Sequence, residues 1–215
     1  MPFRLLVVPG VTVDKWTRMW SERRPTTELQ VVSTGAHLSD DVDAGIVRLP
    51  IDRDMVDAIT LYTEVTVVVV PRDHLVAAAE EVTLDDLTDD QLLRPLDDVL
   101  DWEAPPPEAD RPETTGAAVE LVAAGVGVLV VPQSLARLHH RKDLTYRVVT
   151  DAPTSTVALA WVRERYSDLV EEMIGIVRGR TANSTRGRSA TPPAAKAAPR
   201  KPGRAARKPP PRRGR

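Results

Sequence analysis

The sequence predicts an α/β fold, in which strands and helices alternate along the chain. Short apolar runs such as residues 3–8 are typical of strands that are buried in a parallel sheet. Between these runs lie segments with apolar residues three and four positions apart, the spacing of a helix that covers a sheet with one face. This alternation favours mostly parallel sheets.

Apolar runs, many of them rich in β-branched residues, mark the expected strands. They cover residues 3–8, 29–33, 45–49, 60–70, 92–93, 126–131, 144–149 and 156–162. Proline follows four of these runs directly and ends them, because it has no N–H to donate to a neighbouring strand.

Residues that favour helix N-termini mark the expected helices. Thr12 can cap a helix with Val13, Trp16 and Trp20 on one face, and Pro25 ends it. The other expected helices begin at Thr83 with Asp86 in an approximate capping box, at Thr114 or Thr115 before the stop at Gly125, at Ser134 and at Ser167. Residues 38–42 are expected to form a short helix at most.

Charge divides the 215-residue chain, whose net charge is −2, into two unlike parts. The last 36 residues, from Arg180, hold 12 basic residues and no acidic one, which leaves 17 basic against 31 acidic residues before them, a balance of −14. Residues 181–215 are rich in Ala, Pro, Lys and Arg and contain no large apolar side chain, so disorder is expected there. Such an arm favours non-specific contact with DNA or RNA, although it can also contact the acidic part of its own chain. Its basic residues are Arg186, Arg188, Lys196, Arg200, Lys201, Arg204, Arg207, Lys208, Arg212, Arg213 and Arg215.

Several classes of protein are disfavoured by what the sequence lacks. There is no cysteine, so disulfides, thiolate metal sites and a cysteine nucleophile are excluded. No apolar run has membrane-spanning length and no signal peptide is visible, so we expect a cytoplasmic protein, with nucleoid association an option. His139 and His140 stand where a helix should end, which favours a solvated helix terminus over a metal site. We expect no cofactor and no catalytic residue, because phosphate-binding and nucleophile motifs are absent.

Two turns are candidate anion-binding sites. Residues 9–12 (PGVT) and 114–116 (TTG) each lie before an expected helix, where free N–H groups and the helix dipole attract negative charge. Either turn alone is as well explained by plain helix capping.

Five stretches together resemble the effector-binding domain of LysR-type transcriptional regulators. They are FRLLVVPGVT, VDAGIVRLP, EVTVVVVPRDHLVAA, VTLDDLTDDQLL and ETTGAAVELVAAGVGVLVVPQSLARL. The resemblance implies a domain over residues 1–180 with two Rossmann-like subdomains joined by crossover strands and an effector cleft between them, as in type 2 periplasmic binding proteins. It assigns residues 1–62 and 163–180 to the first lobe and residues 63–162 to the second.

The same resemblance implies a non-catalytic sensor of a small anionic effector, linked to transcription regulation and acting as a homodimer. By position, the ligand-binding residues are Gly10, Val11, Thr12 and Arg48 from the first lobe and Thr114, Thr115 and Pro132 from the second. The first helix, with Trp16 and Trp20, is the candidate dimer contact. The family's winged helix-turn-helix does not precede the first strand here, so we expect no sequence-specific DNA binding by that route.

Two alternatives remain open. The domain could have lost its ligand and serve only as a dimerisation or interaction module. It could also be an enzyme on the same two-lobed scaffold, since a fold does not fix a function. No base–nucleophile or carboxylate pair can be placed in the implied cleft, which argues against the enzyme.

Overall fold

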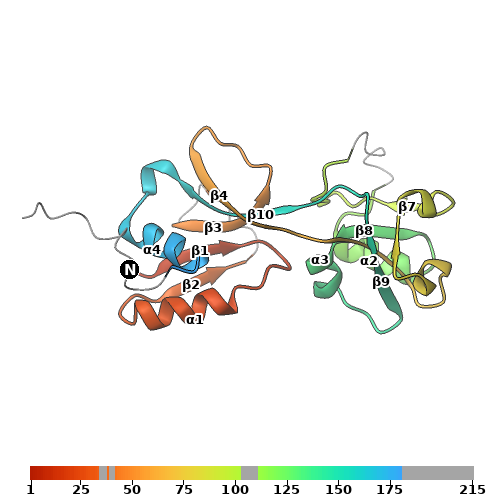
Figure 1. Cartoon of the computed structure of the whole chain (residues 1–215), viewed down its shortest axis with the longest axis horizontal. Coiled ribbons are helices and arrows are strands. Elements are labelled where there is room, and N and C mark those ends of the chain that lie inside the picture. The colour runs from red at the N-terminus through yellow and green to blue at the C-terminus, as the bar shows by residue number, and fades with distance from the viewer. Residues whose placement is uncertain (34–37, 39–41, 103–110, 181–215) are drawn as a thin grey trace, which may run out of the picture. The chain divides into compact units, whose positions relative to one another are not determined.

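The computed structural model describes residues 1–33, 38, 42–102 and 111–180, all within one compact unit, Met1–Ser184. The basic segment 181–215 and most of the short helix expected at 38–42 lie outside the described residues. The strands form two five-stranded sheets (Figure 1).

The first sheet has the strand order β2-β1-β3-β10-β4. Its strands are β1 (Phe3–Val7), β2 (Leu29–Val32), β3 (Ala44–Leu49), β4 (Val56–Thr63) and β10 (Thr156–Val162). The helices α1 (Asp14–Arg23) and α4 (Asp168–Val177) pack on one face, where Trp20 stacks on Phe3 with ring centroids 4.6 Å apart. Trp20 is fully buried there and its indole N–H donates to the Thr27 carbonyl, so it belongs to this core and cannot serve as the expected dimer contact.

The second sheet has the order β6-β9-β5-β8-β7. Its strands are β5 (Thr66–Pro71), β6 (Glu81–Val82), β7 (Leu92–Leu93), β8 (Val128–Pro132) and β9 (Leu144–Val149). The helices α2 (Thr115–Ala123) and α3 (Gln133–Leu138) cover one face. The short turns η1 (Leu75–Ala78) and η2 (Asp85–Leu87) lie over the other face, and η4 (Arg163–Arg165) follows β10.

The strands run in both directions, so the expectation of mostly parallel sheets is wrong. Four neighbouring pairs are parallel and four are antiparallel among the described strands. The cause is the pair of connections between the sheets. β4 leads out of the first sheet and β10 leads back into it, so β10 runs against both β3 and β4.

The single strand expected over residues 60–70 is also wrong. The chain leaves the first sheet after Thr63 and enters the second at Thr66, with Glu64 and Val65 between the two strands. The return lies beside this exit, because the Glu64 N–H donates to the Ser155 carbonyl at 2.8 Å and the Thr66 hydroxyl donates to the Pro153 carbonyl at 2.7 Å. The second-lobe boundary expected at residue 162 is therefore one strand too late, since β10 pairs within the first sheet.

The helix ends at Thr114, Ser167 and Gly125 follow their expected signals, whereas those at Thr12 and Thr83 do not. The helix expected from Thr83 is only the short turn η2, which begins at Asp85. Thr114 caps α2 by accepting from the Ala117 N–H, Ser167 caps α4, and Gly125 follows α2 with φ +73°. Thr12 does not cap α1. Val13 holds that position. Its apolar side chain cannot form a capping hydrogen bond and is buried in the first core.

Candidate functional site

A tight turn follows β1. The Val11 N–H donates to the Val8 carbonyl at 3.4 Å, and Gly10 has φ +84°, as the third residue of a type II turn requires. A methyl group at Gly10 would lie 3.0 Å from the backbone carbon of Ser134, in the first turn of α3. Two features therefore require glycine at position 10: the positive φ angle of its backbone and its close approach to α3.

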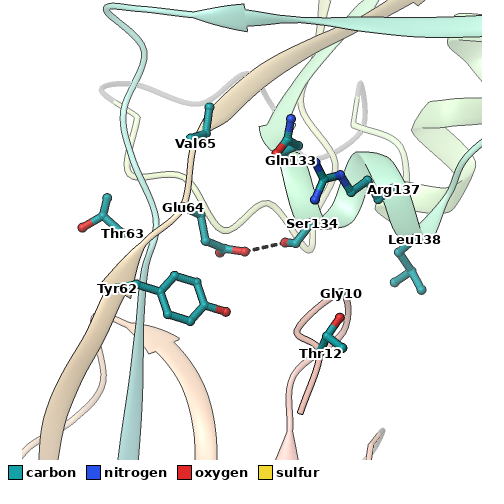
Figure 2. A pocket seen from close by; sticks show the side chains of 10 residues that line it. All are labelled: Gly10, Thr12, Tyr62, Thr63, Glu64, Val65, Gln133, Ser134, Arg137 and Leu138. Carbon is teal, nitrogen blue, oxygen red and sulfur yellow. Dashed lines mark hydrogen bonds between the residues drawn. The ribbon is translucent and has the colours of Figure 1, made fainter. Parts of the chain in front are cut away.

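A pocket of about 520 Å³ opens around this contact and is called the first pocket below. It is lined by Gly10, Thr12, Tyr62, Thr63, Glu64, Val65, Gln133, Ser134, Arg137 and Leu138 (Figure 2). The lining comes from the turn after β1, from the end of β4 and the exit to the second sheet, and from α3. Segments from both sheets therefore line the first pocket.

A buried ion pair lies beside this pocket. Arg48 donates to Glu64 through Nε at 2.7 Å and through Nη2 at 3.3 Å, a two-point contact. The side chains are only 7% and 4% exposed, respectively. Ser134 completes the network, since its hydroxyl accepts from Arg48 at 3.0 Å and donates to the Glu64 carboxylate, as the dashed line in Figure 2 marks. Arg48 is thus committed to a carboxylate of its own chain.

The charges of this network act on two ionisable groups of the first pocket. Burial alone would raise the pKa of Glu64, but hydrogen bonds from Arg48 and Ser134, together with the charge of Arg48, lower it below its ordinary value. Burial raises the pKa of Tyr62, and the negative charge of Glu64 raises it further. At neutral pH the pocket therefore contains an ionised carboxylate and a protonated phenol.

The structure brings only some of the expected ligand-binding residues together. Gly10 and Thr12 line the first pocket, while Val11 packs against the first core. Pro132 is buried at the end of β8, directly before α3, and is not part of the lining. Arg48 is not part of the lining and contacts it through Glu64 and Ser134.

Thr114 and Thr115 both form hydrogen bonds with other groups of the same chain. Thr114 is the cap of α2. Thr115 is 3% exposed, and both its N–H and its hydroxyl donate to the Asp97 carboxylate, at 2.6 and 2.9 Å. An anion does lie at this helix N-terminus, as the dipole favours, but it is a side chain of the same chain. Neither threonine lines the first pocket.

Sequence reasoning missed Glu64, Tyr62, Ser134 and Arg137 as pocket residues. Glu64 carried a signal, because it is the only charged residue between Asp57 and Arg72, in a stretch otherwise suited to strands. Ser134 and Arg137 gave no signal, since a serine or an arginine near a helix terminus is ordinary, and Tyr62 gave none because tyrosine is common in strands. His139 and His140 follow α3 as expected of a helix end. Within the described ranges, no group of three or more His, Asp or Glu residues is placed to hold a metal ion.

The fold and the pocket define a class of protein: a two-sheet α/β ligand-binding domain of the type 2 periplasmic-binding-protein kind. A family model described as the LysR substrate binding domain matches residues 10–182, and the chain belongs to this family. No helix in the described part of the chain has the length and apolar character needed to cross a membrane.

Two curated relatives are regulators. The Hca operon transcriptional activator HcaR of Escherichia coli is 25% identical over 201 residues, covering 83% of this chain and 67% of that protein. The HTH-type transcriptional regulator AlsR of Bacillus subtilis is 24% identical over 152 residues. That match covers 65% of this chain and half the length of AlsR, so the chain corresponds to only part of each relative.

Solved structures share the fold. The BenM effector-binding domain with its effector benzoate has a TM-score of 0.65 at 20% identity, covering 83% of this chain and 90% of that one. The oxidised form of OxyR has a TM-score of 0.63 at 23% identity, with 83% and 97% covered. The resemblance to type 2 periplasmic binding proteins and to LysR effector domains is thereby confirmed at the level of the fold.

Proposed function

We propose that this domain senses a small-molecule effector in the first pocket and passes its occupancy on to transcription. The observation that carries the proposal is the lining itself, in which Gly10 and Thr12 after β1 face Ser134 and Arg137 of α3. A ligand that contacts both groups favours one relative placement of the two sheets over others, which is what a sensor requires. The relatives named as transcriptional regulators and the BenM domain with benzoate support the same role.

The proposed effector is a small organic anion. Arg48 is engaged by Glu64, so the cation left for an acid group is Arg137, which is exposed and whose Nε lies 3.4 Å from the Tyr146 hydroxyl. No carboxylate in the described part of the chain pairs with Arg137. The Thr12 hydroxyl adds a hydrogen-bond donor on the opposite side of the pocket, whereas the Ser134 hydroxyl already donates to Glu64. The benzoate of the BenM domain is a small organic anion of this class.

Thermal unfolding of the full chain tests this role. A panel of organic acids that includes benzoate should contain members that raise the melting temperature, because a ligand at about 100 times its Kd stabilises the folded state by about 2.7 kcal/mol. Arg137→Gln should abolish that stabilisation, whereas Arg53→Gln, which removes an exposed charge elsewhere, should not. Arg48→Ala is a poor test, since it leaves the buried Glu64 without its counter-ion.

The outcome also separates the alternatives. If no acid or neutral analogue stabilises the protein, the sensing role fails and the interaction-module alternative takes its place.

We further propose a homodimer, in keeping with the resemblance, with the partly buried Trp16 on α1 near the contact. Sedimentation at micromolar concentration tests it, and a monomer would remove the dimer from the proposal.

A second proposed activity is non-specific contact of the basic segment with nucleic acid. Its support is compositional, since the last 36 residues carry 12 basic residues, no acidic one and no aromatic one. Phosphate neutralisation releases counterions from DNA, while the lack of aromatic side chains excludes base stacking and favours weak sequence preference.

Fluorescence anisotropy with a short DNA duplex tests the segment. The full chain should bind with a slope of log affinity against log salt of about −0.9 per phosphate contacted, and a chain ending at Gly179 should not bind. Equal, weak binding by both chains would contradict the proposal and leave the segment to contact the acidic part of its own chain.

A further inference from the structure

A second pocket is lined by the end of α3, the residues that follow it and the start of β9 (α3 and β9 are labelled in Figure 1). Its volume is about 350 Å³, within the range of small-molecule sites. It is lined by Val69, Arg72, Ala136, His139, His140, Arg141, Leu144, Thr145, Tyr146 and Arg147, none of which lines the first pocket.

The floor and the rim of this second pocket differ in chemistry. Val69, Ala136 and Leu144 are buried, with 5%, 6% and 4% of their surface exposed, and they offer an apolar floor. The lining also includes three arginines and two histidines, and none of the ten lining residues is acidic. This is unusual for the part of the chain before Arg180, which has a balance of −14.

Two of the arginines keep an uncompensated charge. Arg72 donates through Nε to the Lys142 carbonyl at 2.6 Å, and Arg147 donates to the carbonyls of Ala77, Ala79 and Tyr146. Carbonyl oxygens fix a guanidinium in place without cancelling its charge. Within the described residues, neither arginine forms an ion pair with a carboxylate.

The third arginine is already paired. Arg141 contacts Asp143 at 3.0 Å and Glu120 at 2.5 Å, and the hydrogen bonds that it donates to these two carboxylates raise its pKa above the ordinary value. It therefore shapes the rim. The Arg147 guanidinium lies on the Ala77 and Ala79 carbonyls, on the face of the sheet away from α3, so anion binding is left to Arg72 and the imidazoles. Nitrogen donors of this kind, gathered around a small apolar floor, suit a ligand with an apolar body and a compact multivalent anion.

We propose that the second pocket binds small organic phosphates, with the phosphate at the basic rim and the organic part on the apolar floor. Phosphate offers three acceptor oxygens and up to two negative charges, which matches several separate donors better than a single carboxylate does. This site is independent of the effector proposed for the first pocket, and each can fail without the other.

Proton NMR of the imidazoles provides a direct test. The chain has four histidines, of which His139 and His140 line the second pocket and His74, paired with Asp90, does not. Titration of the full chain with phenyl phosphate should shift the signals of His139 and His140 in a saturable way and leave His74 in place. Inorganic phosphate, which lacks the apolar part, should bind at least about tenfold more weakly, because burying a ring-sized apolar surface contributes more than one factor of ten.

Matched variants locate the site. Arg72→Gln, at an exposed position that does not disturb the core, should weaken phenyl phosphate binding about tenfold, the effect of one lost hydrogen bond to a charged group. Arg53→Gln removes the same charge outside both pockets, and Thr12→Val alters only the first pocket, so neither should change it.

Three results would overturn the proposal. One is the absence of saturable imidazole shifts with phenyl phosphate, and another is unchanged affinity in Arg72→Gln. The third is binding of a DNA duplex that depends on Arg72 in a chain ending at Gly179, without binding of phenyl phosphate, which would make this surface a nucleic-acid contact instead.

Discussion

Glu64 determines how much positive charge the first pocket presents. It lies between two strands of different sheets and holds both Arg48 and Ser134. Removing one partner of a buried ion pair leaves the other charge uncompensated and costs about 3–5 kcal/mol. We expect Glu64→Gln to lower the free energy of unfolding by about 3 kcal/mol, at the lower end because the amide oxygen still accepts hydrogen bonds.

Urea denaturation measures this loss. The double variant Arg48→Met with Glu64→Leu is the control, since replacing both charges with apolar groups should cost much less than replacing one. A loss below about 0.5 kcal/mol in Glu64→Gln, the range of ordinary surface substitutions, would contradict a tightly held pair.

The lowered pKa of Glu64 also predicts a dependence on pH. A carboxyl group with a folded-state pKa below its unfolded value contributes stability above the unfolded pKa, and this contribution is lost as pH falls through the folded pKa. We therefore expect the free-energy difference between wild type and Glu64→Gln to be full at neutral pH and to shrink below about pH 4.5. Asp98, whose pKa is raised by burial, contributes with the opposite sign in both proteins and cancels in the difference. Urea titrations between about pH 7 and about pH 3 test this, and a constant difference would contradict it.

Gly10 predicts a substitution effect with a matched control elsewhere in the chain. Gly10 and Gly125 have similar positive φ values, +84° and +73°. A methyl group at Gly10 meets the Ser134 backbone at 3.0 Å, whereas one at Gly125 meets nothing within 4 Å. Both changes to alanine should cost about 1–3 kcal/mol of backbone strain, and only Gly10→Ala should also weaken effector binding in the first pocket. Equal effects on binding would show that contact with α3 plays no part.

At the scale of the elements, α2 differs from its expected role. Its first turn is completed by Thr114 as cap and by the Asp97 carboxylate on Thr115. We expect Thr114→Ala to reduce stability by about 1 kcal/mol, the ordinary cost of a lost cap, and to leave effector binding unchanged. Unfolding curves and the thermal-shift panel measure the two effects separately, and weaker effector binding would return Thr114 to the ligand site.

Elements defined by local chemistry were predictable from the sequence, whereas their pairing was not. Thr114, Ser167 and Gly125 mark helix ends through hydrogen bonds and φ angles that act over a few residues. Whether residues 60–70 form one strand or two depends on which distant strands they pair with, and β propensity is the same on both sides of Glu64.

The site was predictable only in outline for the same reason. The turn at Gly10 was visible because proline and glycine fix it locally. Arg48 was expected to be open to a ligand, but its partner stands 16 residues away in the next sheet connection, and no pattern near Arg48 indicates a carboxylate there. Asp97 satisfies Thr115 across 18 residues and was missed in the same way.

At the scale of the whole molecule, the two sheets use the chain differently. The two cores of the second sheet consist only of residues between Val67 and Ala152. The main core of the first sheet combines β1 and β3 with β10 and α4, from opposite ends of the described chain. We expect residues 65–155 to fold as an isolated fragment with a cooperative urea transition, because every core contact of the second sheet lies within it. A non-cooperative transition would show that the second sheet depends on the first.

This division sets an order of events on the ribosome. The second sheet can fold as soon as Ala152 has emerged, while the strands β1 to β4, made earlier, still lack β10. Until β10 and α4 are synthesised, Ile46 and Ile59 have no Leu159 between them, and the Trp20 face has no Met173 to cover it. The amino-terminal half of the domain is thus translated first and completed last. In this interval its apolar strand edges are exposed, and we expect chaperone binding to nascent chains to concentrate there.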